Sequence, residues 1–207
     1  MLTLWYPVIN SEDVMALTLI RDFLAEHRAK TRLRVLAYPQ ISKDPNYCAE
    51  QHKLIEKHNG HVVYVCFNSV PREEWEYLAK LNFPYTFERD AEQKPFYKRY
   101  PEANPVVWPI DGKRPQPWHS SLVAKFRRAN KRTNGYIAAG LHGIGTGGAA
   151  KFLVTHSNMQ MIASSVGSKP FCVMVDSKLD PASYEITTCA VESAVMPLLE
   201  MPRSVEP

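Results

Sequence analysis

Nine consecutive residues, 140–148, hold five of the nine glycines in this 207-residue chain and read GLHGIGTGG. Glycine at this density indicates a backbone that adopts positive φ, or one that lies against a neighbour which a Cβ atom would obstruct. A short apolar run, Tyr136–Ala139, precedes the stretch, and a helical pattern from Ala149 follows it. We therefore expect a Gly-rich loop (140–148) that joins a strand to a helix.

The same stretch fits the G-x-G-x-x-G pattern of dinucleotide-binding turns through Gly143, Gly145 and Gly148. In that pattern the backbone approaches a pyrophosphate, and the N-terminus of the helix supplies partial positive charge. The next acid at the end of a predicted strand, Asp176, lies further from the glycines than the roughly 20 residues expected. Nucleotide binding, another phosphate contact and a purely structural bend therefore remain open. The candidate phosphate-binding residues are Gly143, Gly145, Thr146, Gly147 and Gly148.

Two titratable residues near this stretch are candidates for catalysis. His142 lies inside the Gly-rich loop, where a polar ring is seldom part of a core and is able to exchange a proton. Asp176 ends the predicted strand Phe171–Asp176, a position at which open sheets of parallel strands place ligands. A small enzyme acting on a nucleotide or phosphate ester is accordingly one interpretation, and the sequence leaves open whether the protein is an enzyme.

Positive charge is concentrated in the middle of the chain. Between Lys94 and Arg132 ten basic residues face only two acids, a net charge of +8, whereas the whole chain carries +4. Residues 120–132 are predicted to form a helix, with Lys125, Arg128 and Arg132 on one face. A basic helix beside aromatic residues is typical of contacts with a phosphate backbone and stacked bases.

We therefore expect a binding protein for a phosphate-rich partner, with nucleic acid preferred and other polyanions possible. An acidic protein partner and a merely solvated charged face are the alternatives. If the Gly-rich loop lies at the same edge of the sheet as Lys125 and Arg128, the loop and the basic residues form one binding site. The candidate nucleic-acid-binding residues are Lys113, Arg114, Lys125, Arg127, Arg128, Lys131 and Arg132.

Strand and helix patterns alternate through residues 1–82. Helices are expected at about 11–29, 47–58 and 68–82, and strands at about 2–6, 32–38 and 61–67. Such alternation predicts an α/β fold with three layers and a mainly parallel sheet. An α+β fold whose second half pairs antiparallel is the alternative.

Residues 83–118 differ in character because they contain seven of the sixteen prolines together with eight aromatic residues. Prolines at this spacing exclude long helices and central strands, whereas the aromatic residues argue against a disordered linker. We expect an irregular excursion of a single domain, 1–207, with a further strand starting at Tyr85. Docking of this segment on a partner would make the protein an interaction module, such as an inhibitor or an accessory subunit.

Other features narrow the function classes. No apolar run approaches the roughly 20 residues of a membrane helix, and no signal peptide is evident. We therefore expect a cytoplasmic protein without membrane contact, whose four widely spaced cysteines are reduced thiols. The histidines and cysteines lack the paired spacings of a zinc site, so no metal is expected. Cofactor and oligomeric state cannot be read from the sequence.

Overall fold

The protein is described by a computed structural model that covers most of the second half of the chain and parts of the first half. The described residues are 11–26, 53, 60–65, 72–81, 83–89, 91, 95–99, 107–108, 118–128, 133–180, 182–183, 185–191 and 195–198. The strands expected at 2–6 and 32–38 lie outside these ranges, as does the helix expected at 47–58 apart from Lys53. Within the described part of the chain, no helix is long and apolar enough to cross a membrane.

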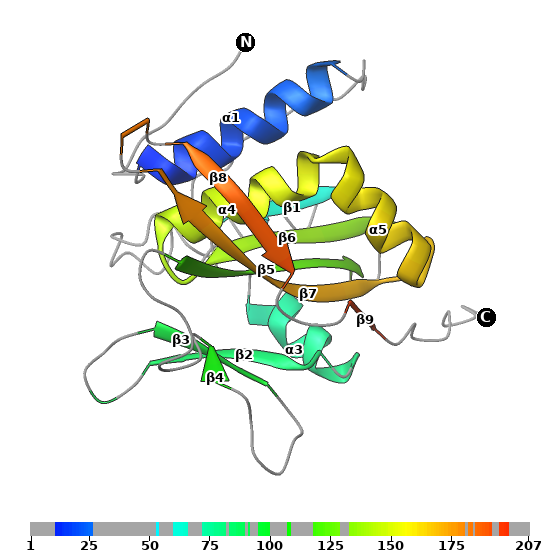
Figure 1. Cartoon of the computed structure of the whole chain (residues 1–207). Coiled ribbons are helices and arrows are strands. Elements are labelled where there is room, and N and C mark those ends of the chain that lie inside the picture. The colour runs from blue at the N-terminus through cyan, green and yellow to red at the C-terminus, as the bar shows by residue number, and fades with distance from the viewer. Residues whose placement is uncertain are drawn as a thin grey trace, which may run out of the picture.

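A six-stranded mixed sheet forms the centre of the protein (Figure 1). The strands are β1 (Val62–Val65), β5 (Trp118–Arg127), β6 (Asn134–Gly140), β7 (Phe171–Leu179), β8 (Ile186–Val191) and β9 (Met196–Pro197). Their order is β1-β6-β5-β7-β8, and β9 also pairs with β7. Among the described strands of this sheet, β1 and β6 pair in parallel and the other pairs are antiparallel. The chain thus combines helices with a mixed sheet, and the described part of that sheet is mostly antiparallel instead of mainly parallel as expected.

The strands joined by helices do run in the same direction, but they are not neighbours. β6 and β7 are connected by α4 (Gly143–Val154) and α5 (His156–Val166). Each of the two strands pairs antiparallel with β5, which lies between them. A strand–helix–strand pattern correctly indicates parallel direction, yet it carries no sign that an earlier strand is inserted between the two.

The basic helix predicted over residues 120–132 is wrong, because residues 118–127 form the central strand β5. Leu122 and Phe126 are buried on one face of the sheet, and Val123 is buried on the other. A strand buried on both faces lacks the polar–apolar alternation that would reveal it, and Leu, Ala, Lys and Arg all favour helices. Pairing with neighbours on both sides outweighs this local preference.

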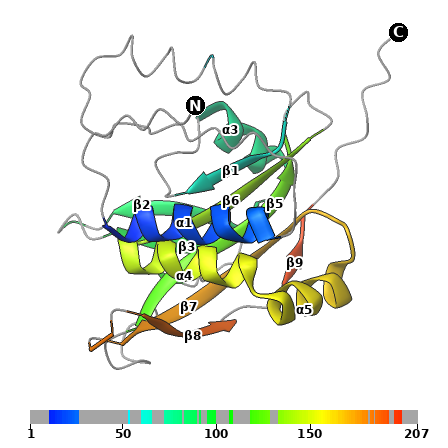
Figure 2. The same cartoon turned by 90° about the horizontal axis from the view of Figure 1, so that it is seen from above.

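Helices cover both faces of the sheet. On one face, α4 and α5 pack over Val123 and its neighbours in β6 and β7. Above them, α1 (Ser11–Glu26) lies against α4 (Figure 2), and Ala16 and Ala150 belong to one buried apolar cluster. On the other face, α3 (Arg72–Lys80) and the turn after it bury Leu78 and Leu81 in the same cluster as Leu122. The helices expected near 11–29 and 68–82 are confirmed in α1 and α3.

A second, three-stranded antiparallel sheet lies on the α3 side of the molecule (Figure 1). It consists of β2 (Tyr85–Arg89), β3 (Pro95–Arg99) and β4 (Val107–Trp108). The strand expected at Tyr85 is therefore confirmed, and the described parts of residues 83–118 are more regular than expected. Proline is compatible with the first residue of a strand, where it stands in β3.

The glycines of residues 140–148 allow α4 to lie very close to the sheet. A Cβ atom on Gly140 would overlap the backbone of Gly145 and Thr146, and one on Gly148 would overlap the side chain of Ser177. A Cβ atom on Gly145 would lie 2.8 Å from the Ser120 carbonyl oxygen. None of these glycines has positive φ. Among the described glycines, Gly167 has it. Close approach, rather than unusual backbone conformation, therefore accounts for Gly140, Gly145 and Gly148.

Replacement of Gly148 tests this packing. We expect Gly148→Ala to lower the free energy of unfolding by about 1–3 kcal/mol, because an overpacked core forces neighbours to move. Ser177→Gly removes the side chain that the new methyl group meets, so the double variant should regain part of that loss. Urea unfolding of the two single variants and the double variant measures this coupling.

Gly140→Ala serves as the comparison, because the atoms it meets belong to the backbone. No side-chain truncation relieves that overlap, so Ser177→Gly should not improve the stability of this variant. Strictly additive effects of Gly148→Ala and Ser177→Gly would contradict the proposed contact.

Candidate functional site

Strands β6 and β7 end, and β5 begins, at one edge of the sheet, here termed the carboxyl edge. In the register, Ser121 pairs with Gly140 and His119 pairs with Ser177. The Gly-rich stretch lies at this edge, because β6 ends at Gly140 and α4 begins at Gly143. Sheets containing parallel strands ordinarily bind ligands beyond the carboxyl ends of those strands.

The connection between β6 and α4 is a short, hydrogen-bonded turn instead of an open loop. The Thr146 hydroxyl accepts a hydrogen bond from the Gly140 amide at 3.1 Å and donates to the His142 carbonyl at 3.5 Å. The Leu141 amide donates to the Ser120 carbonyl oxygen at 3.2 Å, which ties the turn to β5. These bonds fix the backbone of His142, whose side chain stays exposed.

Most of the candidate phosphate-binding residues lie inside the packed helix. Gly145, Thr146, Gly147 and Gly148 are buried in α4, and Gly143 at its first position is partly exposed. The first amide groups of a helix have no acceptor within it and are available to an anion. Phosphate contact by this stretch stays a prediction, and Gly143 is the partly exposed one of the five candidates.

Two histidines lie side by side at the carboxyl edge. His119 in β5 and His142 before α4 have ring centroids 6.4 Å apart, with ring planes almost perpendicular. This separation is too large for a hydrogen bond between the rings. The sequence singled out His142 as a candidate for catalysis through its glycine neighbours, and the fold brings His119 beside it.

The environment of His119 favours its neutral form. Burial lowers the pKa of the His119 imidazole below its ordinary value of 6.5, and the neighbouring His142 lowers it further. Asp176 acts in the opposite direction and raises the same pKa by a smaller amount. At neutral pH His119 is therefore mainly an uncharged imidazole, which is the form that accepts a proton.

The second predicted catalytic residue, Asp176, lies at the same edge but on another face. It pairs directly with Ser120, and directly opposed residues share a face of the sheet. The side chain of His119, one residue earlier in β5, points to the opposite face. Asp176 is buried, at 4% exposure, and it acts on His119 electrostatically.

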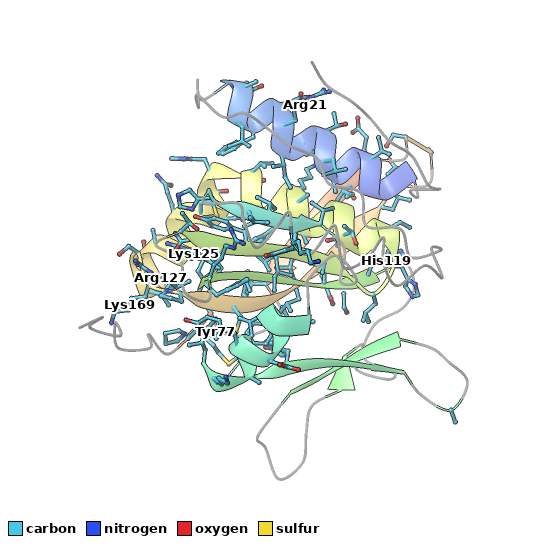
Figure 3. The ribbon with its side chains drawn as sticks, turned by 180° about the vertical axis from the view of Figure 1, so that it is seen from behind. Arg21, Tyr77, His119, Lys125, Arg127 and Lys169 are labelled. Carbon is cyan, nitrogen blue, oxygen red and sulfur yellow. The ribbon has the colours of Figure 1, made fainter. Side chains whose placement is uncertain are left out.

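The basic residues of β5 lie at the other end of the strand, here termed the amino edge. Lys125 pairs with Phe171 at the start of β7, and its ammonium group donates to the Ser168 carbonyl oxygen at 2.8 Å. Arg127 and Lys169 are exposed near it, and Figure 3 shows the three cations together, far from His119. His119 and Lys125 are six positions apart along the strand, about 20 Å. The Gly-rich stretch and the basic residues therefore do not form one site.

Arg128 differs from its neighbours because it is buried, at 2% exposure. Its guanidinium donates to the Gly60 carbonyl oxygen at 3.2 Å, and its amide donates to the Thr133 carbonyl oxygen. Arg128 therefore holds the end of β5 against the segment that leads into β1. Four other predicted nucleic-acid-binding residues lie outside the described ranges: Lys113, Arg114, Lys131 and Arg132.

Aromatic rings adjoin the cations at the amino edge. Tyr136 pairs with Lys125 across β5 and β6, and its ring lies 6.4 Å from that of His61. His61 is exposed, and its Nδ1 accepts a hydrogen bond from the Asn134 amide at 3.1 Å. Sequence reasoning missed Tyr136, His61 and Lys169, because only the strand register brings them beside Lys125.

Other expectations from the sequence concern metal binding, the cysteines and docking through residues 83–118. No group of three or more His, Cys, Asp or Glu side chains in the described part of the chain is arranged to hold a metal ion. Cys172 and Cys189 are free thiols, and burial raises the pKa of the Cys189 thiol. Docking through residues 83–118 stays a prediction, since much of that segment lies outside the described ranges.

No protein-family model matches this sequence, and comparison with curated proteins and with solved structures finds no match.

The stability of the protein should depend on the titration of His119. Because folding lowers the pKa of this group, the unfolded chain binds its proton more readily, and stability falls as pH decreases through 6.5. The contribution is fully present above that value and fully lost below the lowered pKa of the folded state. We expect the melting temperature to fall between about pH 7.5 and pH 5.5, and His119→Gln to reduce this fall.

His156→Gln is the matched control, because His156 is exposed at the start of α5. Its melting temperature should follow that of the unsubstituted protein across the same pH range. An identical pH dependence in the His119→Gln variant would contradict the lowered pKa.

Proposed function

We propose that this protein binds a phosphate-rich partner, with single-stranded nucleic acid preferred, at the amino edge of its sheet. The observation that carries the proposal is the gathering of Lys125, Arg127 and Lys169 from two distant segments of the chain. With Tyr136 and His61 they make up what we term the amino-edge surface. It replaces the basic helix as the proposed binding element.

The charge of this surface is available to a partner. None of the three cations forms an ion pair with a described residue. The carboxyl end of α5 lies nearby, but its dipole corresponds to only about half a negative charge. Most of the three positive charges therefore remains uncompensated, which favours a polyanion and counterion release on binding.

The aromatic rings favour unpaired bases over a closed duplex. A base stacked on an aromatic side chain contributes about 1–3 kcal/mol, and this contribution does not depend on sequence. Tyr136 is partly exposed and His61 is exposed, so both have surface that a base is able to cover. An acidic protein would use the cations but gain little from the rings, and this difference separates the two partners experimentally.

Replacement of the two exposed cations tests the proposal. We expect Arg127→Gln combined with Lys169→Gln to weaken binding of a labelled single-stranded oligonucleotide at least 10-fold at low salt. The slope of log Kd against log salt should decrease by about two, one for each phosphate group that the variant no longer neutralises. Fluorescence anisotropy over a series of salt concentrations measures both quantities.

Lys80→Gln is the control for loss of a cation elsewhere, because Lys80 is exposed on α3, on the opposite face of the sheet. Its affinity should change less than twofold. Tyr136→Leu should weaken binding to the single strand but not to heparin, which has no bases to stack. Equal loss with both polyanions would argue against base stacking, and no binding of any oligonucleotide at about 50 mM salt would overturn the proposal.

A further inference from the structure

The histidine pair at the carboxyl edge has ring nitrogens that no structural role occupies. No described residue forms a hydrogen bond with a ring nitrogen of His119 or His142. His61 provides a contrast, because its Nδ1 accepts a backbone hydrogen bond. The ring nitrogens of both histidines are therefore open to solvent and to a ligand.

The two rings also differ in the way that acid–base catalysis requires. His119 is partly buried in β5, and its lowered pKa keeps it neutral and able to accept a proton. His142 is exposed to solvent immediately before α4. The pair thus places a neutral, partly buried imidazole beside a solvent-exposed one.

We propose that His119 and His142 form a general base and general acid pair that hydrolyses a phosphodiester bond. The choice of a diester rests on the proposed binding of nucleic acid, whereas the pairing of the histidines does not. A diester suits this edge because its leaving alkoxide needs a proton, which a positioned acid supplies.

A water molecule between the rings attacks phosphorus, and its proton moves to a ring nitrogen of His119. The bond from phosphorus to the leaving oxygen breaks, and the proton of the His142 imidazolium moves to that oxygen. The products are a phosphate monoester and an alcohol. A proton then returns from His119 to His142 through solvent, and no oxidant or reductant is required.

Two substrates with different leaving groups distinguish the two roles. Bis(p-nitrophenyl) phosphate releases an anion that is stable without a proton, whereas a dinucleotide releases an alkoxide that needs one. We expect His119→Gln to reduce kcat/KM about 100-fold for both substrates, because both need the base. His142→Gln should reduce kcat/KM about 100-fold for the dinucleotide and less than 10-fold for the p-nitrophenyl ester.

His156→Gln, a histidine outside the pair, should hydrolyse both substrates at the rate of the unsubstituted protein. Oligonucleotide binding without hydrolysis of either substrate would overturn the catalytic pair and leave the binding proposal standing. Hydrolysis without oligonucleotide binding would overturn the binding proposal and leave the catalytic pair standing.

NMR titration of the unsubstituted protein covers the case in which a His119 variant fails to fold. Addition of dimethyl phosphate should shift the imidazole resonances of His119 and His142 together and leave those of His61 and His156 unchanged. Absence of any shift in the pair, or equal loss of both activities in the His142→Gln variant, would exclude the assigned roles.

Discussion

The close contact between α4 and the sheet is the constraint on which the rest of the structure depends. Gly140, Gly145 and Gly148 each lie where a Cβ atom would meet a neighbouring strand or turn. Because the helix approaches so closely, the turn between β6 and α4 is short, and the Thr146 hydroxyl binds both of its sides. The position of His142 beside His119 follows from that turn.

The two ends of β5 have different chemistry because the sheet is mixed. Its first residues lie at the carboxyl edge with the end of β6, and its last residues lie at the amino edge with the start of β7. A single strand therefore contributes a half-buried imidazole to one edge and two cations to the other. In an all-parallel sheet the start of every strand would share one edge, and His119 would lie away from His142.

The sequence predicted local features well and pairing poorly. Helical spacing from Ser11 and the glutamates after Arg72 reveal α1 and α3, because a helix is formed by contacts within one segment. The identity of β5 depends on strands that follow it in the chain, and its Leu, Ala, Lys and Arg content favours a helix in isolation. His142 was found through its glycine neighbours. By contrast, His119, Tyr136 and Lys169 become significant only in the register of a sheet that no local pattern specifies.

The central position of β5 also affects the order in which strands pair during folding. Only residues 128–133 separate it from β6, whereas residues 128–170 separate it from β7. Closing the shorter loop costs less chain entropy, so the β5–β6 hairpin is the pairing that forms with the smaller penalty. That hairpin leads directly into the start of α4, which means that the histidine pair belongs to one contiguous unit. The amino-edge surface also needs Lys169 and β7. It is therefore complete only after α4 and α5, which connect β6 to β7, have packed on the sheet.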